Sequence, residues 1–196
     1  MRTITITGDP SPDVLDTLAA SLRRGQVVLL PTDTIYGLHA LAGNAEAVGK
    51  IAALKERGEG KRFVVIAAST DQLLAYGAAV PDVLRSVWPA PLTAVVRHPE
   101  GSVAVRVPDL PWLRALLERT GPLVSTSANR SGEPPIREPS ALARGLQEKI
   151  DVALDAGLCE GQPSTIVDFT CDEPRLIREG APIFAQFLWK TLRKTL

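Results

Sequence analysis

Hydroxyl groups and a carboxylate lie directly after an apolar stretch near the start of the chain. Residues 27–30 are Val-Val-Leu-Leu, and Thr32, Asp33 and Thr34 follow them. A short apolar run of this kind predicts a buried strand, and open α/β sheets bind ligands just beyond the C-terminal ends of their strands. The sequence therefore predicts that these polar side chains lie at a ligand-binding edge.

A second polar cluster follows the apolar residues 122–124. Residues 125–132 read Ser-Thr-Ser-Ala-Asn-Arg-Ser-Gly, so hydroxyls, an amide and backbone N–H groups would meet in one turn. Such groups suit phosphate oxygens or a sugar. The same composition is also typical of a loop without a ligand. Ser164 and Thr165, which open another apolar run, present the same alternatives of a small ligand or a simple turn.

Cationic side chains are concentrated between residues 50 and 62, where they are diluted by only two carboxylates; they are Lys50, Lys55, Arg57, Lys61 and Arg62. Such a cluster can hold a polyphosphate, although a solvated helix end with cations that complement the helix dipole is an equally good interpretation. Position favours phosphate binding, because the cluster ends where a strand at 63–67 is predicted. Arg106 and Arg178 each close an apolar strand, from which an arginine can reach a carboxylate, a phosphate or merely a surface ion pair.

The sequence excludes the two common glycine-rich phosphate-binding loops. Gly60 and Lys61 are followed by Arg62, so the P-loop pattern is broken, and no GxGxxG is present. A bound nucleotide would therefore be held by side chains.

Cysteines and histidines predict no metal site and no covalent catalysis. Cys159 and Cys171 lack the paired spacing of a zinc site or a disulfide framework and are expected to be free thiols. His39 and His98 are far apart, and neither lies in an HxxH-type or triad-like setting. We expect His39 to fill a strand position.

The elements that must position these residues follow from hydrophobic periodicity and capping signals. Strands are predicted at 3–7, 26–31, 38–41, 63–67, 92–97, 103–107, 123–126, 152–154, 165–169 and 175–178. Helices are predicted from 12 to the stop at Gly25, after the cap at Asn44, and at 69–76, 81–88, 111–119, 140–147 and 182–196. Several later links are too short for a parallel crossover, so the sheet should be mixed. Residues 88–93, stiffened by two prolines, are interpreted as scaffold.

Length and composition predict one globular domain spanning residues 1–196. The chain has 196 residues, is 45% hydrophobic, and carries 22 cationic and 22 acidic side chains. A balanced charge argues against a protein that coats nucleic acid. No apolar run approaches the roughly 20 residues of a membrane helix, and no targeting segment is evident. We therefore expect a cytoplasmic protein that does not contact the membrane.

Taken together and in this order, the motifs resemble the YrdC-like family of threonylcarbamoyl-adenylate synthases, in its short single-domain bacterial form. The matching segments are PTDTIYGL at 31–38, KxR at 55–57 with Lys61, WPAPLT at 88–93, AVRVP at 104–108, STSANRSG at 125–132, STIVD at 164–168 and LIREG at 176–180. They cover about residues 10–185. The chain departs from the usual family pattern at Ala90, where glycine is common, and at Arg62 and Phe63, where proline and leucine are common.

The resemblance implies a fold and a reaction. The fold would be an α/β, twisted, mixed parallel and antiparallel sheet flanked by helices, with a concave cationic cavity. The reaction would convert L-threonine, bicarbonate or CO₂, and ATP into threonylcarbamoyl-AMP and pyrophosphate, for modification of a tRNA adenosine next to the anticodon. Mg²⁺ would enter through ATP without a protein ligand. The product would pass to a downstream tRNA threonylcarbamoyl transferase complex, and weak tRNA binding is possible.

The resemblance also implies roles for particular residues. ATP contacts would be Arg57, Lys61, Ser127, Asn129 and Arg178. Threonine contacts would be Thr34, Arg106, Ser125 and Ser164. Thr32 and Tyr36 would line the cavity together with Lys55, and Lys55 and Arg57 would act electrostatically, with no residue serving as a nucleophile.

Two other functions fit parts of the sequence. One is an RNA-binding or ribosome-assembly protein that uses a cationic concavity without catalysis, although single-strand binders usually stack bases on aromatic side chains and this chain has few. The other is transfer of a carbamoyl group from a different donor, as in the YrdC-like part of hydrogenase-maturation proteins. The chain lacks the acylphosphatase and zinc-finger segments that accompany that activity.

Overall fold

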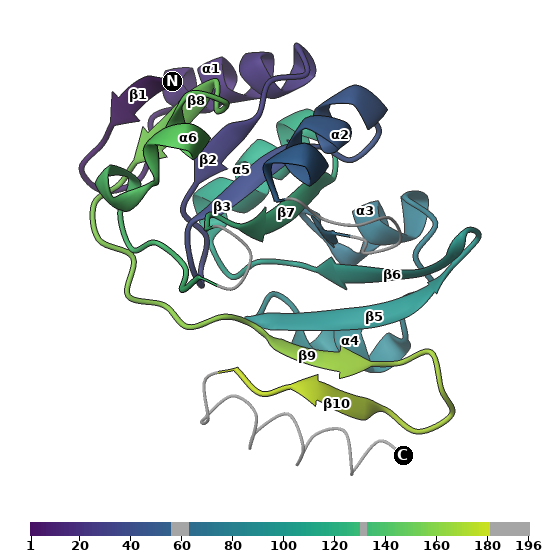
Figure 1. Cartoon of the computed structure of the whole chain (residues 1–196). Helices are drawn as coiled ribbons and strands as arrows, with labels where there is room; N and C mark the ends of the chain where they lie inside the picture. Colours follow the sequence, from purple (N-terminus) through teal and green to yellow (C-terminus); the bar gives the residue numbers. More distant parts are fainter. Residues whose placement is uncertain (56–62, 130–132, 181–196) are drawn as a thin grey trace.

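The computed structural model describes residues 1–55, 63–129 and 133–180, and within them a ten-stranded sheet forms the body of the protein (Figure 1). The strands are β1 (Arg2–Thr5), β2 (Val28–Leu30), β3 (Gly37–Leu41), β4 (Val64–Ile66), β5 (Leu92–His98), β6 (Gly101–Arg106), β7 (Leu123–Ser127), β8 (Val152–Asp155), β9 (Thr165–Asp168) and β10 (Arg175–Arg178). Their order across the sheet is β1-β8-β2-β3-β7-β4-β6-β5-β9-β10.

The sheet is mixed, which confirms the expectation drawn from the short links. Parallel pairs form between β1 and β8, β2 and β8, β4 and β6, and β5 and β9, whereas the other neighbours are antiparallel. The strands predicted at 92–97 and 103–107 form a hairpin, because β5 and β6 pair with His98 opposite Gly101. The antiparallel neighbours β3, β7 and β4 lie at the centre of the sheet and bring the two predicted polar clusters together.

Most of the helices lie close to their predicted positions, and three of them begin at a side-chain cap. Within the described residues the helices are α1 (Pro12–Arg23), α2 (Ala45–Leu54), α3 (Thr70–Ala75), α4 (Asp82–Val87), α5 (Pro111–Thr120) and α6 (Arg144–Gln147), with a short 3₁₀ helix at Pro139–Ala141. The Ser11 hydroxyl accepts from Val14 N, and Asn44 Oδ1 accepts from Ala47 N, so each side chain satisfies a backbone N–H that the helix leaves unpaired.

The helix predicted at 140–147 is two separate elements. Leu142 and Ala143 between them are extended, and Leu142 is buried in the core. The helix predicted at 182–196 lies outside the described residues.

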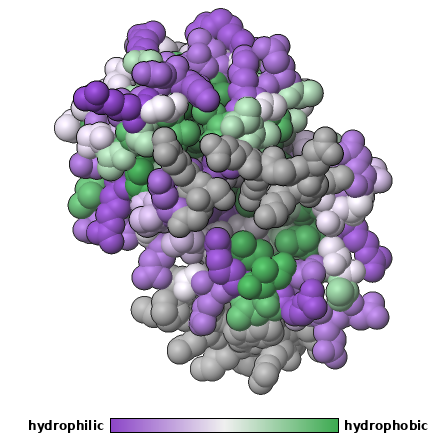
Figure 2. All heavy atoms as spheres, viewed as in Figure 1, coloured by the Kyte–Doolittle hydropathy of each residue, from purple (hydrophilic) through white to green (hydrophobic). Residues whose placement is uncertain are grey.

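Alternate residues of the strands face two hydrophobic cores. On β2, Val28 and Leu30 pack with α1 and α5, whereas Leu29 packs on the opposite face with α2. The face of the molecule seen in Figure 2 is mostly hydrophilic, with apolar residues gathered in one area of its lower half. No helix within the described residues has both the length and the apolar character that crossing a membrane requires.

The segment between β8 and β9 links distant parts of the sheet and passes against the turn between β2 and β3 (Figure 1). We call residues 156–164 the crossing segment. The Tyr36 hydroxyl accepts from Ala156 N at 3.1 Å and donates to Gly157 O at 2.9 Å. Cys159 Sγ lies 3.4 Å from Thr34 O. Residues 32–36 are therefore held in place by a part of the chain far away in sequence.

Gly161 is the point of closest approach between the crossing segment and this turn. A Cβ at this position would lie 1.8 Å from Thr34 O, which is backbone and has no other rotamer to adopt. We expect Gly161→Ala to lower the free energy of unfolding by about 1–3 kcal/mol, because the two segments must separate. Urea unfolding followed by tryptophan fluorescence measures this change.

Gly49→Ala is the matched control. Gly49 lies in α2, and a Cβ there meets nothing within 4 Å. This substitution should raise the unfolding free energy by about 0.5–1 kcal/mol, because alanine favours the helix. A Gly161→Ala protein as stable as the wild type would show that the crossing segment does not need to lie against Thr34.

Candidate functional site

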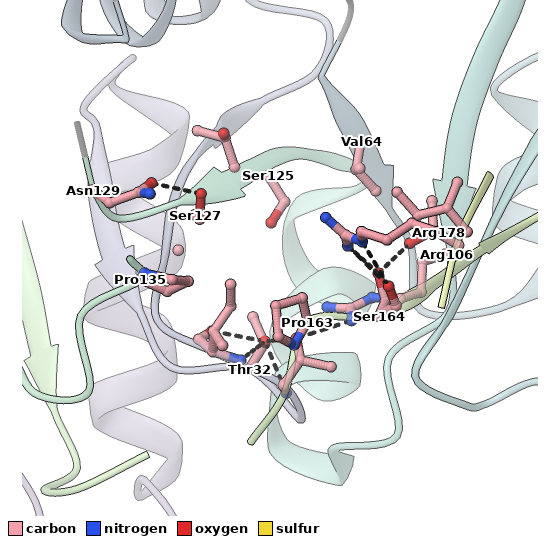
Figure 3. A pocket seen from close by; sticks show the side chains of 16 residues that line it. Thr32, Val64, Arg106, Ser125, Ser127, Asn129, Pro135, Pro163, Ser164 and Arg178 are labelled. Atoms are coloured by element: carbon pink, nitrogen blue, oxygen red, sulfur yellow. Dashed lines mark hydrogen bonds between the residues drawn. The ribbon is translucent and has the colours of Figure 1, made fainter. Parts of the chain in front are cut away.

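A cavity of about 390 Å³ lies where the β2–β3 turn, the ends of β6 and β7, the crossing segment and β10 meet (Figure 3). Its lining is formed largely by hydroxyl groups and two guanidinium groups. The polar side chains are Thr32, Thr34, Thr93, Arg106, Ser125, Thr126, Ser127, Asn129, Ser164 and Arg178. Val64 lines the cavity and also packs against the hydrophobic core that contains residues of α1 and α5. The cavity therefore lies on the same face of the sheet as that core.

Arg106, the last residue of β6, places a buried positive charge in the cavity wall. Its side chain is 5% exposed, and Nη2 lies 3.3 Å from Oδ1 of Asp33, which is 6% exposed. Nη1 donates to Thr34 Oγ1 at 3.0 Å. Burial lowers the pKa of Arg106, the Asp33 carboxylate raises it, and the charge of Arg178 lowers it. Asp33 therefore offsets part of the cost of burying this cation.

Asp33 is itself fixed by the backbone, since its Oδ2 accepts from Asp109 N at 3.0 Å. Within the described residues, Asp33 Oδ1 and Arg106 Nε lack a hydrogen-bond partner although both are buried. The ion pair thus leaves hydrogen-bonding capacity unused beside the cavity.

The threonines of the β2–β3 turn form a hydroxyl chain that ends at Arg106. The Thr32 hydroxyl donates to Ile35 O at 2.8 Å and lies 2.8 Å from the Thr34 hydroxyl. Because the proton of Thr32 is used by Ile35, Thr34 is the donor between the two threonines, and its oxygen accepts from Arg106. This local network fixes the orientation of Thr34 before any ligand binds.

Lys55, at the end of α2, holds Ser127 and Asn129 together where β7 ends. Ser127 Oγ donates to Asn129 Oδ1 at 2.6 Å. Lys55 Nζ donates to Ser127 O at 3.0 Å, to Asn129 Oδ1 at 2.7 Å and to Asn129 O. Lys55 is buried at the end of α2, so it acts as a clamp on this turn.

Arg178 on β10 brings a second guanidinium to the cavity (Figure 3). Its Nη2 and Nε donate to Ser164 O at 2.8 and 3.2 Å. The Ser164 hydroxyl lies 2.8 Å from Thr93 Oγ1. Burial lowers the pKa of Arg178. Two like charges thus face one cavity, which favours an anionic ligand between or beside them.

His39 lies behind the cavity wall and is fully buried. Its Nε2 is 3.1 Å from Ser125 Oγ. The pKa of His39 is lowered to about 4, mainly by burial and also by the charge of Arg106, while backbone carbonyls of Gly37 and Val28 partly oppose both effects. The imidazole is therefore neutral near pH 7.

Most of the residues expected at the site do line this cavity, namely Thr32, Thr34, Arg106, Ser125, Ser127, Asn129, Ser164 and Arg178. Tyr36 and Lys55, which the resemblance places in the cavity, are not among the residues that line it. The Tyr36 hydroxyl bonds the crossing segment, and Lys55 bonds the β7 turn. Arg57 and Lys61 lie outside the described residues, so their roles stay predictions.

Sequence reasoning missed the contacts of three contributors. The sequence places Asp33 at the ligand-binding edge but does not identify Arg106 as its partner, although a carboxylate next to a buried strand is a signal that it needs a cation. Thr93 lies in the segment interpreted as scaffold, yet its position between buried Leu92 and Ala94 on β5 is a polar interruption that points to a partner. The contact of His39 with Ser125 follows from the pairing of β3 and β7, which periodicity alone does not reveal.

The described residues contain no group of three or more His, Cys, Asp or Glu side chains that could hold a metal ion. The carboxylate beside the cavity, Asp33, is already paired with Arg106. Both free cysteines expected from the sequence are present, Cys159 partly buried and Cys171 exposed. The polar groups that the lining itself offers are hydroxyls, an amide and two guanidinium groups.

Comparison with known proteins relates the chain to one family. The family model for Sua5, YciO and YrdC, whose description is "Telomere recombination", matches residues 20–180. A threonylcarbamoyl-AMP synthase of Pseudomonas aeruginosa is 36% identical over 154 residues, which cover 71% of this chain and 83% of the relative. That of Marinobacter nauticus is 35% identical over 179 residues, covering 83% of this chain and 94% of the relative.

Solved structures agree with this relation. Sua5 of P. abyssi, in a complex with L-threonine, superposes with a TM-score of 0.89 at 29% identity, covering 97% of this chain and 61% of that one. YciO of E. coli has the same fold, with a TM-score of 0.80 at 23% identity over 92% of this chain and 95% of that one.

The buried ion pair can be tested by removing its negative charge. Asp33→Asn keeps the shape of the side chain but leaves Arg106 as an uncompensated buried cation. We expect the free energy of unfolding to fall by about 3–5 kcal/mol, measured by urea denaturation.

Asp71→Asn is the matched control, because the Asp71–Arg85 pair has the same 3.3 Å separation but the Asp71 side chain is 84% exposed. Its removal should cost less than about 1 kcal/mol. Equal, small losses in both variants would contradict the importance assigned to Asp33.

His39 should make stability depend on pH. The folded protein holds this imidazole neutral down to a pKa of about 4, whereas in the unfolded chain its pKa is near 6.5. Between these values the unfolded state binds more protons, so the unfolding free energy should fall as the pH drops from 6.5 to 4, by up to about 1.4 kcal/mol per pH unit.

The variant His39→Gln should lose that part of the slope while keeping His98. Asp168 has a lowered pKa and loses its contribution as the pH falls from its ordinary value near 3.8, which is below this window. Identical slopes for wild type and variant between pH 4 and 6.5 would show that His39 takes up a proton without unfolding.

Proposed function

The chain belongs to the Sua5, YciO and YrdC family, and from this we propose that it is a threonylcarbamoyl-AMP synthase. It uses L-threonine, bicarbonate or CO₂, and ATP, and it forms threonylcarbamoyl-AMP and pyrophosphate. The curated relatives that match most of its length carry this activity in their names, and the P. abyssi Sua5 neighbour was solved with L-threonine.

The observation that carries this proposal is the presence of Arg106 and Arg178 in one hydroxyl-lined cavity (Figure 3). We assign Arg106 to the carboxylate of threonine, because its charge is buried and oriented by Asp33 and Thr34. We assign Arg178, together with Ser127 and Asn129, to the nucleotide. Arg57 and Lys61 are further ATP contacts in this proposal.

The proposed chemistry needs no enzymic nucleophile. The amine of threonine adds to CO₂ and loses a proton to give a carbamate, and a carbamate oxygen then attacks the α-phosphorus of ATP while pyrophosphate leaves. In such a reaction the protein contributes mainly by positioning the reactants and neutralising charge. The rigid hydroxyl network and the two guanidinium groups fit that requirement.

Mg²⁺ is proposed to arrive with ATP and to be held by its phosphates, where it would neutralise charge on the triphosphate. The described residues offer no cluster of carboxylates for it, and Asp33 is paired with Arg106. The chain's own contribution to the leaving pyrophosphate would come from Arg178 and from Arg57 and Lys61.

Selectivity for threonine is proposed to come from hydroxyl matching in the cavity. Thr34 and Ser164 are both buried and have fixed hydrogen-bond partners. A substrate hydroxyl that completes such a network is favoured, and an analogue without it leaves buried polar groups unpaired. Glycine should therefore be a poor substrate, whereas serine should be intermediate because it keeps a hydroxyl but lacks the methyl group.

Several finer points are also proposals. We propose that residues 1–196 act as one domain in the cytoplasm, and that the product passes to a downstream tRNA threonylcarbamoyl transferase complex. tRNA binding by this chain itself is proposed to be weak, because its cationic and acidic side chains balance.

The proposal predicts a product that can be identified directly. Purified protein incubated with ATP, Mg²⁺, bicarbonate and threonine should form threonylcarbamoyl-AMP, detected by mass, with release of pyrophosphate. Arg178→Gln should lower kcat/KM by a factor of roughly 30–1,000, which corresponds to about 2–4 kcal/mol of lost transition-state stabilisation.

Arg175→Gln, on the same strand, is the matched control, because its side chain is 75% exposed and pairs only loosely with Asp168, at 3.8 Å. Its activity should stay within about twofold of wild type. Undiminished turnover in Arg178→Gln would reject the role of Arg178. Tight tRNA binding without any ATP turnover would instead support an RNA-binding protein.

A further inference from the structure

His39 on β3 and Ser125 on β7 are neighbours at the centre of the sheet, and both lie on the face that carries the cavity. They are directly paired in the antiparallel register of β3 and β7, and His39 Nε2 lies 3.1 Å from Ser125 Oγ. Ser125 lines the cavity, whereas the imidazole is fully buried behind it. A side chain that is closed to ligands therefore contacts one that a ligand can reach.

Gly37 creates the space that the imidazole occupies. A Cβ at Gly37 would lie 2.9 Å from His39 Cε1, 3.3 Å from His39 Nε2 and 3.1 Å from Thr126 O. The ring thus fills the gap that the missing side chain leaves on the same face of β3. Any larger residue at position 37 would push the imidazole away from Ser125, so the pair is built into the strand.

The position of the single proton on the neutral ring decides what Ser125 can do. Among the described residues, no acceptor stands in hydrogen-bonding geometry to His39 Nδ1, although carbonyls of Gly37 and Val28 lie near the ring. A proton on Nδ1 would leave a buried N–H without a partner, which is rarer in proteins than an unpaired acceptor. The proton therefore belongs on Nε2, where it meets Ser125 Oγ.

We infer that His39 is a positioning residue whose Nε2–H donates to Ser125, so that the serine hydroxyl points its own proton into the cavity. Ser125 then acts as a hydrogen-bond donor on the same cavity wall as the two guanidinium groups of Arg106 and Arg178. Its partner would be an anionic oxygen of the amino-acid substrate, a carboxylate or carbamate. This inference rests on the proposed function for the identity of that substrate, but its tautomer can be observed without substrate.

The first test is direct observation of the imidazole in the wild-type protein. The chain has two histidines, so ¹⁵N-histidine labelling gives two ring systems, and the His39→Gln spectrum identifies the one that belongs to His39. At pH 7 we expect a neutral ring with the proton on Nε2. A proton on Nδ1 would overturn the inference, because Ser125 would then donate to the ring and face the ligand with a lone pair.

The second test is a double-mutant cycle on threonine affinity, measured by calorimetry. His39→Phe fills the same space without a donor and should weaken binding by about threefold to tenfold, the range for one neutral hydrogen bond. Ser125→Ala should weaken it at least as much. In the Ser125→Ala background, His39→Phe should have less than a twofold further effect, because the group through which it acts is gone.

His39→Gln is the conservative control, because its amide can still donate to Ser125. It should recover at least half of the affinity, on a logarithmic scale, that His39→Phe loses. Unfolding midpoints and ATP affinity should change little among the folded variants, which separates positioning from general damage. If His39→Phe and Ser125→Ala weakened threonine binding independently, so that their fold-changes multiplied in the double variant, the inference would be overturned.

The two proposals fail in different ways. If the wild-type protein bound no threonine, the proposed function would be wrong, and the ¹⁵N spectrum would still decide whether His39 donates to Ser125. If the wild type bound threonine and made the adenylate, but the ring carried its proton on Nδ1, only the role of His39 would be rejected.

Discussion

The rest of the site depends on keeping the charged guanidinium of Arg106 in a place where water barely reaches it. Removing a cation from water is costly, and the cost is offset only when its partners are close and well oriented. Asp33 supplies the opposite charge and Thr34 supplies an acceptor. Both belong to the turn after β2, so this turn must lie against the end of β6. The crossing segment then holds the turn there through Tyr36 and Gly161.

A buried cation that is only partly neutralised is a preformed anion site. Arg178 adds a second positive charge on the same cavity, and its charge lowers the pKa of Arg106. In the free protein these like charges oppose each other, and an anionic ligand relieves that repulsion. The carboxylate of an amino acid and the phosphates of ATP both provide the charge that the cavity lacks. The repulsion between the two arginines and the geometry of the free cavity therefore both favour an anionic substrate.

The sequence was sufficient to locate the polar residues at the strand ends. It was insufficient to identify the contacts between them. Thr34, Arg106 and Ser125 could be found because polar residues directly after or within apolar strands are unusual and therefore informative. The mixed sheet could be inferred because short links forbid parallel crossovers. The partners could not be found, because which strands become neighbours is a property of the whole chain: β7 lies between β3 and β4, and only this pairing brings His39 to Ser125.

Tyr36 and Lys55 show why membership of a motif is not the same as a place in the cavity lining. Tyr36 stands among residues that line the cavity, yet its hydroxyl bonds backbone groups of the crossing segment. Lys55 bonds the β7 turn through two backbone carbonyls and the side chain of Asn129. A reaction without an enzymic nucleophile depends on how accurately the reactants are held, and misplacement by about 1 Å can be costly. Residues that fix the lining are then as necessary as the lining itself. Lys55 and Tyr36 would therefore serve the proposed chemistry indirectly, by holding the backbone that carries the lining residues.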